Sequence, residues 1–225
     1  MNNNIQINIQ GTENKSITLP LDTLSHTIIF GATGSGKSNL LHMLITNLVN
    51  TYSPEELNLA LFDPKYVEFN MYKSLPHLIG GIMKSPTDIM HYFEDWIDER
   101  LKTKNKTPLV IIVDEIVELL YNKTILSKFI SVLNKGTKSN IYLIMATQRP
   151  SLIPEEILNK TATQICFPID SDNLPKSLAS KLKTTQIKSH GEMLFSNKNK
   201  IEYMQTAYVT PTEINDVILK YKKYN

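Results

Sequence analysis

Short, fully apolar runs recur along the chain and alternate with longer stretches in which apolar residues return every three or four positions. The apolar runs predict buried strands, and the longer spacing predicts helices with one buried face. The predicted strands are 27–30, 57–62, 109–113, 141–146 and 163–169. Because apolar strands alternate with helices, the pattern indicates an α/β fold with a mostly parallel central sheet flanked by helices.

Other segments carry their own signals. Ile5, Ile7 and Ile9 alternate with polar residues, so residues 1–25 are predicted to form a short N-terminal β-hairpin. Ser53-Pro-Glu-Glu56 has the composition of a helix start, and Pro76 with Gly80-Gly81 indicates a loop. A helix is predicted to follow the glycine loop and to end at about residue 50. Further helices are predicted near 67–72, at 85–102, within 116–134, and at 154–160, 172–183 and 211–223. A second hairpin is predicted at 191–208.

Length and composition fit one globular unit. The 225 residues are expected to form a single domain, 1–225, with the hairpin 1–25 as an extension. No apolar run is long enough to span a membrane, and the N-terminus lacks the layout of a signal peptide. The single cysteine, Cys166, excludes an internal disulfide and suits the cytoplasm.

Charge is divided unevenly between the two halves. Residues 1–100 carry 6 basic and 11 acidic side chains, whereas residues 101–225 carry 18 basic and 11 acidic ones. The second half is therefore suited to present a basic face to a polyanion, although scattered surface lysines explain the excess equally well.

Gly31-x-x-x-x-Gly36-Lys37-Ser38 has the spacing of a phosphate-binding loop between a buried strand and a helix. Its glycines let backbone N–H groups turn toward phosphate beside the positive end of the helix. Lys37 is expected to neutralise the β- and γ-phosphates, and the Ser38 hydroxyl to hold Mg²⁺. The predicted nucleotide-binding residues are Gly31, Ala32, Thr33, Gly34, Ser35, Gly36, Lys37, Ser38 and Asn39, with ATP and Mg²⁺ as cofactors.

Polar side chains follow two further apolar strands, where parallel sheets bind their ligands. Asp114 is a candidate Mg²⁺ ligand, and Glu115 is a candidate base for an attacking water. An ordinary acidic helix start is the alternative for this pair. Gln148 is a candidate sensor of the γ-phosphate or the water, and a polar turn before Pro150 is its alternative.

Arg100 is one of only two arginines and lies near the end of an acidic amphipathic helix. A surface ion pair with a neighbouring carboxylate and a catalytic arginine inserted into an adjacent subunit both fit this position. The five histidines show no zinc-ligand spacing, so no zinc site is predicted.

Several segments together resemble the motor domain of the FtsK/SpoIIIE family, within the FtsK–HerA class of P-loop ATPases. They are His26 to Ser38, Ser53-Pro-Glu-Glu56 with Leu61-Phe-Asp-Pro-Lys65, Leu75-Pro-His-Leu78, Val110 to Glu115, Ile141 to Pro150 with Ala-Thr-Gln-Arg-Pro, and Gly191-Glu-Met-Leu-Phe195. The order matches, and the resemblance covers about residues 25–210.

The resemblance implies a RecA-like core, a hexameric ring and ATP-driven movement along double-stranded DNA. By position, Lys37 and Ser38 match the Walker A residues, Asp114 and Glu115 the Walker B pair, and Gln148 the sensing glutamine. Arg100 falls where the family has an arginine-bearing helix end. Lys135 and Lys138 precede the last core strand, in the segment that carries a family pore loop, and are the predicted DNA contacts.

The chain also departs from the family pattern. We expect neither a membrane-spanning N-terminus nor an orientation-reading module, and only 102–108 remains of an insertion that is usually longer. We therefore expect a minimal cytoplasmic DNA translocase from a mobile element or virus, in the host cytoplasm if viral. Viral genome packaging is a specific version, in which a portal or docking protein supplies attachment. The alternative is a protein-handling ATPase of a secretion system.

Overall fold

The computed structural model describes residues 5–13, 15–93, 97–102, 107–170, 174, 187, 189–197 and 200–222. Within this part of the chain no helix is both long and apolar enough to cross a membrane. The predicted helix at 172–183 lies almost wholly outside the described residues, as do Trp96 of the predicted helix 85–102 and the lysines at 104 and 106.

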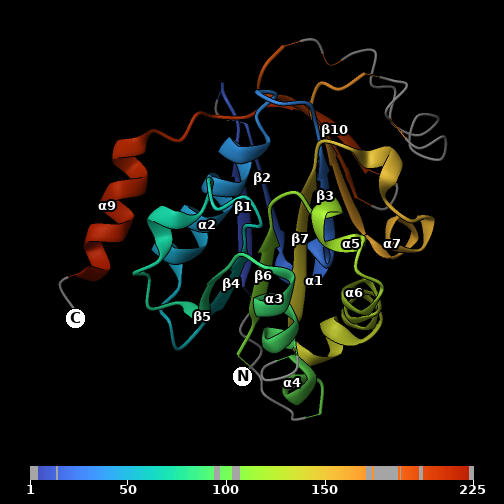
Figure 1. Cartoon of the computed structure of the whole chain (residues 1–225). Helices are drawn as coiled ribbons and strands as arrows, with labels where there is room; N and C mark the ends of the chain where they lie inside the picture. The colour runs from blue at the N-terminus through green and yellow to red at the C-terminus, as the bar shows by residue number, and fades with distance from the viewer. Residues whose placement is uncertain are drawn as a thin grey trace.

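One large sheet forms the centre of the molecule (Figure 1). Six of its strands are parallel, from β8 to β5, and β9 and β10 are antiparallel. The strand order is β10 (Lys200–Gln205), β9 (Glu192–Asn197), β8 (Thr163–Cys166), β3 (Thr27–Phe30), β7 (Ile141–Thr147), β6 (Leu109–Val113), β4 (Asn58–Phe62) and β5 (Leu78–Met83). The apolar strands β3, β6 and β7 are buried along their whole length, as their sequence pattern predicts.

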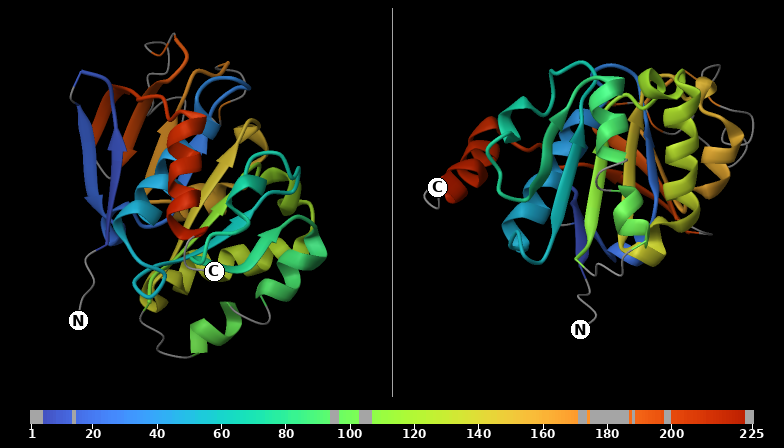
Figure 2. Two further views of the ribbon diagram at one scale, coloured as in Figure 1. Left: turned by 90° about the vertical axis from the view of Figure 1, so that its left-hand side faces the viewer. Right: turned by 60° about the horizontal axis from the view of Figure 1, so that its bottom comes forward.

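Helices cover both faces of this sheet, and successive strand residues alternate between two apolar cores. One core joins Ile29 and Ile112 to α2 (Lys37–Thr51), α9 (Pro211–Lys222) and the hairpin of β1 (Gln6–Gln10) and β2 (Ser16–Pro20), which Figure 2 shows from two further sides. The other core joins the strands to α3 (Pro86–Tyr92), α5 (Val117–Leu120), α6 (Lys123–Lys135) and α7 (Glu155–Lys160). The shorter elements are α1 (Leu21–Leu24), α4 (Asp98–Lys102), η1 (Asn70–Tyr72), η3 (Gly136–Ser139) and η4 (Pro150–Leu152).

The expected α/β architecture with a mostly parallel sheet and an N-terminal hairpin is confirmed. The helix start at Ser85 is also present: its hydroxyl accepts from Asp88 N at 3.1 Å, and the Asp88 carboxylate accepts from Ser85 N at 3.1 Å.

Two local predictions were wrong. Ser53-Pro-Glu-Glu56 forms a turn instead of a helix, because Asn58 N already donates to Pro108 O at 2.9 Å and begins β4. The supposed loop around Gly80-Gly81 is the edge strand β5, in which both glycines have positive φ, 81° and 73°. The β4–β5 register shifts there, so the glycines mark a β-bulge in a parallel strand pair.

The aromatic cluster under α6 supports a stability prediction. Phe129 lies edge-on to Phe93 and Phe62, with ring centroids 5.1 and 6.2 Å away. We expect Phe129→Ala to lower the free energy of unfolding by about 3 to 5 kcal/mol, since it leaves a cavity between α6 and the sheet. Urea unfolding followed by circular dichroism measures the loss.

The matched control is Tyr121→Ala, which removes an aromatic ring that is 67% exposed on the same side of the sheet. We expect it to change the free energy of unfolding by less than about 0.5 kcal/mol. Equal losses in the two variants would show that the cluster does not determine stability.

Candidate active site

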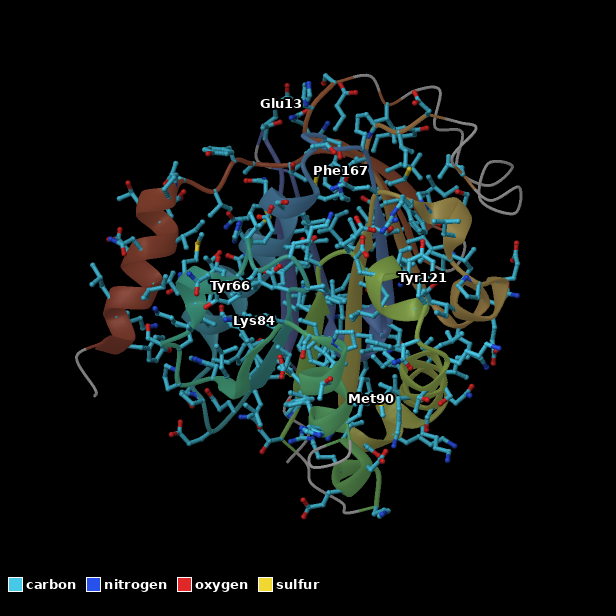
Figure 3. All side chains as sticks on the ribbon, viewed as in Figure 1. Glu13, Tyr66, Lys84, Met90, Tyr121 and Phe167 are labelled. Carbon is cyan, nitrogen blue, oxygen red and sulfur yellow. The ribbon has the colours of Figure 1, made fainter. Side chains whose placement is uncertain are left out.

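The phosphate loop occupies residues 31–36, between the end of β3 and the start of α2. Its glycines are required by geometry: Gly36 has φ 122°, and a Cβ there would lie 2.9 Å from the Phe167 ring and 3.1 Å from Gly191 Cα. Figure 3 places Phe167 at the end of the molecule opposite Met90, which lies on α3. The loop thus forms a backbone cradle that a larger residue would fill.

Backbone contacts from β8 and β9 fix the loop from outside. Ala32 N donates to Pro168 O at 3.0 Å, and Gly191 N donates to Ser35 O at 2.8 Å. His190 Nδ1 donates to Gly34 O at 2.6 Å. The sequence analysis did not assign His190 to the site, because nothing in the sequence shows that 189–191 returns to the phosphate loop.

Lys37 is 6% exposed, and its Nζ donates to Ala32 O at 3.0 Å. Burial lowers the pKa of Lys37, and the carboxylates of Asp114, Glu115 and Glu68 oppose this effect. Ser35 Oγ is also buried and has no hydrogen-bond partner among the described residues. An ammonium and an unpartnered hydroxyl in a glycine cradle fit the phosphates of a nucleotide.

Two carboxylates, Asp63 and Asp114, directly follow the ends of β4 and β6. Burial, and after it the charges of Glu68, Asp63 and Glu115, raise the pKa of Asp114 to about 6, against the lowering effect of Lys37. Asp114 and the Ser38 hydroxyl are hard oxygen donors, as Mg²⁺ prefers, and a dication would offset the repulsion that raises this pKa. The residues present therefore fit Mg²⁺, with Ser38 and Asp114 as its protein ligands.

Glu115 is 3% exposed and has φ 53°, an unusual backbone conformation for a glutamate. Its Oε1 accepts from Thr147 Oγ1 at 2.7 Å, and its Oε2 accepts from Gln148 N at 3.2 Å. Arg149 Nε lies 3.8 Å from Oε1, and its Nη2 bonds Glu118 at 2.6 Å. These contacts hold the carboxylate in one orientation, as a general base requires.

Gln148 reaches the phosphate loop directly, because its Oε1 accepts from Thr33 Oγ1 at 2.8 Å. A pocket of about 500 Å³ opens beside this contact. Its lining residues are Thr33, Gly34, Gly36, Lys37, Ser38, Asn39, Glu68, Gln148, His190, Gly191, Gln205, Thr206 and Tyr208. The volume falls in the range of small-molecule sites.

Lys135, Lys138 and Arg100 lie near the amino-terminal ends of the parallel strands, away from the phosphate loop. Lys135 ends α6 and Lys138 lies in η3, which leads into the first residue of β7, and both lysines are exposed. Arg100 is 6% exposed and its guanidinium donates to Thr107 O, just before β6. Figure 1 shows α4 at this lower end of the sheet. The chain therefore does not bring Arg100 to its own phosphate loop, and a role in a neighbouring site stays a prediction.

Comparison with known proteins finds similarity to one family. Residues 1–106 match the sequence model of the FtsK/SpoIIIE family. The DNA translocase FtsK of Staphylococcus aureus (strain Mu50 / ATCC 700699) is 26% identical over 96% of this chain and 32% of its own length. That of Caldanaerobacter subterraneus subsp. tengcongensis is 28% identical over 88% of this chain and 32% of its own length. The resemblance to the FtsK/SpoIIIE family is confirmed.

Solved structures share the fold. The pCW3 conjugation coupling protein TcpA with ATPγS has a TM-score of 0.79 and 21% identity, over 99% of this chain and 72% of that one. EssC (ATPases 2 and 3) of Geobacillus thermodenitrificans has a TM-score of 0.79 and 17% identity, over 99% of this chain and 49% of the EssC chain. The DNA-packaging ATPase B204 of Sulfolobus turreted icosahedral virus has a TM-score of 0.62 and 15% identity, over 82% of this chain and 98% of the B204 chain.

These structures confirm the expected α/β fold with its mostly parallel central sheet. The chain spans about a third of the length of the curated relatives it matches, 32% for both FtsK proteins above. The activity of this chain, its substrate and its partners are therefore matters for proposal.

The site supports a prediction with two variants. Lys37→Ala should weaken nucleotide binding and abolish hydrolysis, because the phosphates lose the only lysine of the loop. Glu115→Gln should still bind Mg–ATP but turn over at least ~10²-fold slower, because the positioned base is lost. Phosphate release and fluorescent-nucleotide binding measure the two effects. Normal turnover by Glu115→Gln would assign the base elsewhere, with Gln148 next to test.

Proposed function

We propose that the chain is an ATP-hydrolysing double-stranded DNA translocase, a minimal ring motor of the FtsK/SpoIIIE type from a mobile element or virus. Viral genome packaging is one specific version of this role. One observation carries the proposal: Lys37 and Gln148 line one pocket, and Gln148 N donates to the Glu115 carboxylate, in a chain that matches this family over residues 1–106. An ATP-driven motor works where ATP is available, so we place it in the cytoplasm.

The chain's own groups suggest how ATP is hydrolysed. The cradle and Lys37 bind the phosphates, and Glu115, fixed by Thr147, accepts a proton from the attacking water. Gln148, bonded to Thr33, is placed to respond when a γ-phosphate occupies the loop. Mg²⁺ held by Ser38 and Asp114 would neutralise charge that develops on the phosphates.

A protein-handling role is the second candidate. The Type VII secretion ATPase EccC of Thermomonospora curvata shares the fold of this chain with a TM-score of 0.75, close to the 0.79 of TcpA. The lysine-rich second half favours DNA, because exposed lysines suit phosphate contacts that do not depend on base sequence. Stimulation of ATP hydrolysis by DNA separates the two candidates.

We expect DNA binding to tolerate any sequence and to weaken steeply as salt rises. Replacing Lys135 and Lys138 together by Gln should reduce DNA-stimulated hydrolysis, leave basal hydrolysis intact and lower the salt slope by about one per lysine. Replacing Lys15 and Lys200, exposed lysines on other elements, is the charge-matched control. If DNA neither binds nor stimulates at low salt, the motor proposal is wrong and the protein-handling role gains.

We also propose that the chains assemble into a hexameric ring in which Arg100 acts on the neighbouring site. Arg100→Ala subunits should then be inactive alone, and mixing them with Lys37→Ala subunits should restore part of the hydrolysis, depending on protein concentration. The buried contact with the Thr107 carbonyl gives the competing outcome: a lower unfolding midpoint and no gain on mixing. That outcome, in a preparation shown to form rings, would end the trans role.

A further inference from the structure

Glu68 lies on the wall of the nucleotide pocket and has no role in the function proposed above. It follows β4 by a short turn, and its side chain is 28% exposed. Lys37 and Ser38 line the same pocket. Its carboxylate therefore stands beside the groups that we expect to bind the phosphates and Mg²⁺.

The backbone around Glu68 is fixed by a buried carboxylate. Asp63 is fully buried, and its Oδ2 accepts from Glu68 N and from Phe69 N, both at 2.9 Å. Phe69 is itself fully buried in the core beneath α2. The turn from 63 to 69 is thus anchored at both ends, and Glu68 is presented to the pocket from a rigid support.

The side chain of Glu68 is directed toward α2. Its Oε2 lies 3.5 Å from His42 Nε2, one helical turn beyond Ser38 on α2, and Ser38 lines the same pocket. The other ring nitrogen, His42 Nδ1, lies 2.9 Å from the Tyr72 hydroxyl. These contacts hold the Glu68 carboxylate beside the first turns of α2, in the pocket that Ser38 also lines.

We propose that Glu68 is a positioning residue for Mg²⁺–ATP, whose carboxylate orients the Ser38 hydroxyl and accepts hydrogen bonds from water bound to the ion. Mg²⁺ in nucleotide sites keeps several waters, and carboxylates that hold such waters tune metal affinity. The inference rests on the proposed nucleotide site and adds to it a carboxylate that neither the Walker A nor the Walker B pattern contains.

This role predicts two effects of opposite sign. Without metal, the Glu68 carboxylate repels the triphosphate, so Glu68→Gln should bind metal-free nucleotide several-fold more tightly than the unaltered chain. With metal, the same variant loses an acceptor for bound water, so the Mg²⁺ concentration for half-maximal effect should rise ~10-fold. A merely structural partner of His42 would weaken both kinds of binding together.

The experiment measures binding of the fluorescent nucleotide mant-ATP, first in EDTA and then across a MgCl₂ titration, with thermal unfolding recorded for every variant. Glu13→Gln removes one negative charge from an exposed site on the N-terminal hairpin and should leave both affinities unchanged. Glu68→Asp keeps the charge but shortens the side chain, so it should raise the Mg²⁺ requirement without tightening metal-free binding.

If Glu68→Gln leaves the Mg²⁺ requirement unchanged, the inference about Glu68 is wrong. The proposed function still holds in that case, provided that the unaltered chain hydrolyses ATP. Parallel weakening of both affinities with a lower unfolding midpoint also overturns it. If Glu68→Gln does not fold, an unchanged Mg²⁺ requirement in Glu68→Asp decides against the inference. If the unaltered chain binds no mant-ATP at any Mg²⁺ concentration, the nucleotide site itself fails, and the inference with it.

Discussion

The burial of the parallel strands from both sides is the constraint on which the rest of the structure depends. The interior positions of β3, β6 and β7 are occupied by apolar side chains, so polar groups can lie only where the strands end. Asp63, Asp114 and Thr147 stand at or just after such ends, and parallel direction brings these ends to one edge. The site is thus a consequence of the sheet.

That edge concentrates negative charge around the buried ammonium of Lys37. Glu68, Asp114 and Glu115 act on Lys37, and the pKa of Asp114 rises to about 6 because burial and the charges of Glu68, Asp63 and Glu115 disfavour its ionised form. A triphosphate alone would add to the repulsion, whereas a triphosphate with a dication would relieve it. The electrostatics of the pocket therefore favour the metal–nucleotide complex over either component, which is the physical ground for giving Glu68 a role.

Sequence predicted most of the central sheet because its strands are continuous apolar runs, and it located the phosphate loop because that loop has a fixed spacing. It failed where local composition competes with long-range pairing. Gly80-Gly81 looks like a loop, but pairing with β4 makes it an edge strand. His190 joins the site through the return of a distant segment, and Glu68 through the buried anchor at Asp63, and neither leaves a periodic signal.

The predicted nucleotide sensor and the predicted DNA contacts lie at opposite ends of β7. Their separation limits how a motor of this fold could couple ATP hydrolysis to DNA movement. Gln148 follows one end of β7, and Lys138 lies just before the other end. Seven residues of strand span about 23 Å, too far for direct electrostatic contact in salt solution. Because β7 is buried along its length between β3 and β6, it cannot bend without disturbing both cores. A signal between ATP and DNA would therefore travel as a rigid displacement of the strand and of α6, whose last residue is Lys135, and not as a local change at either end.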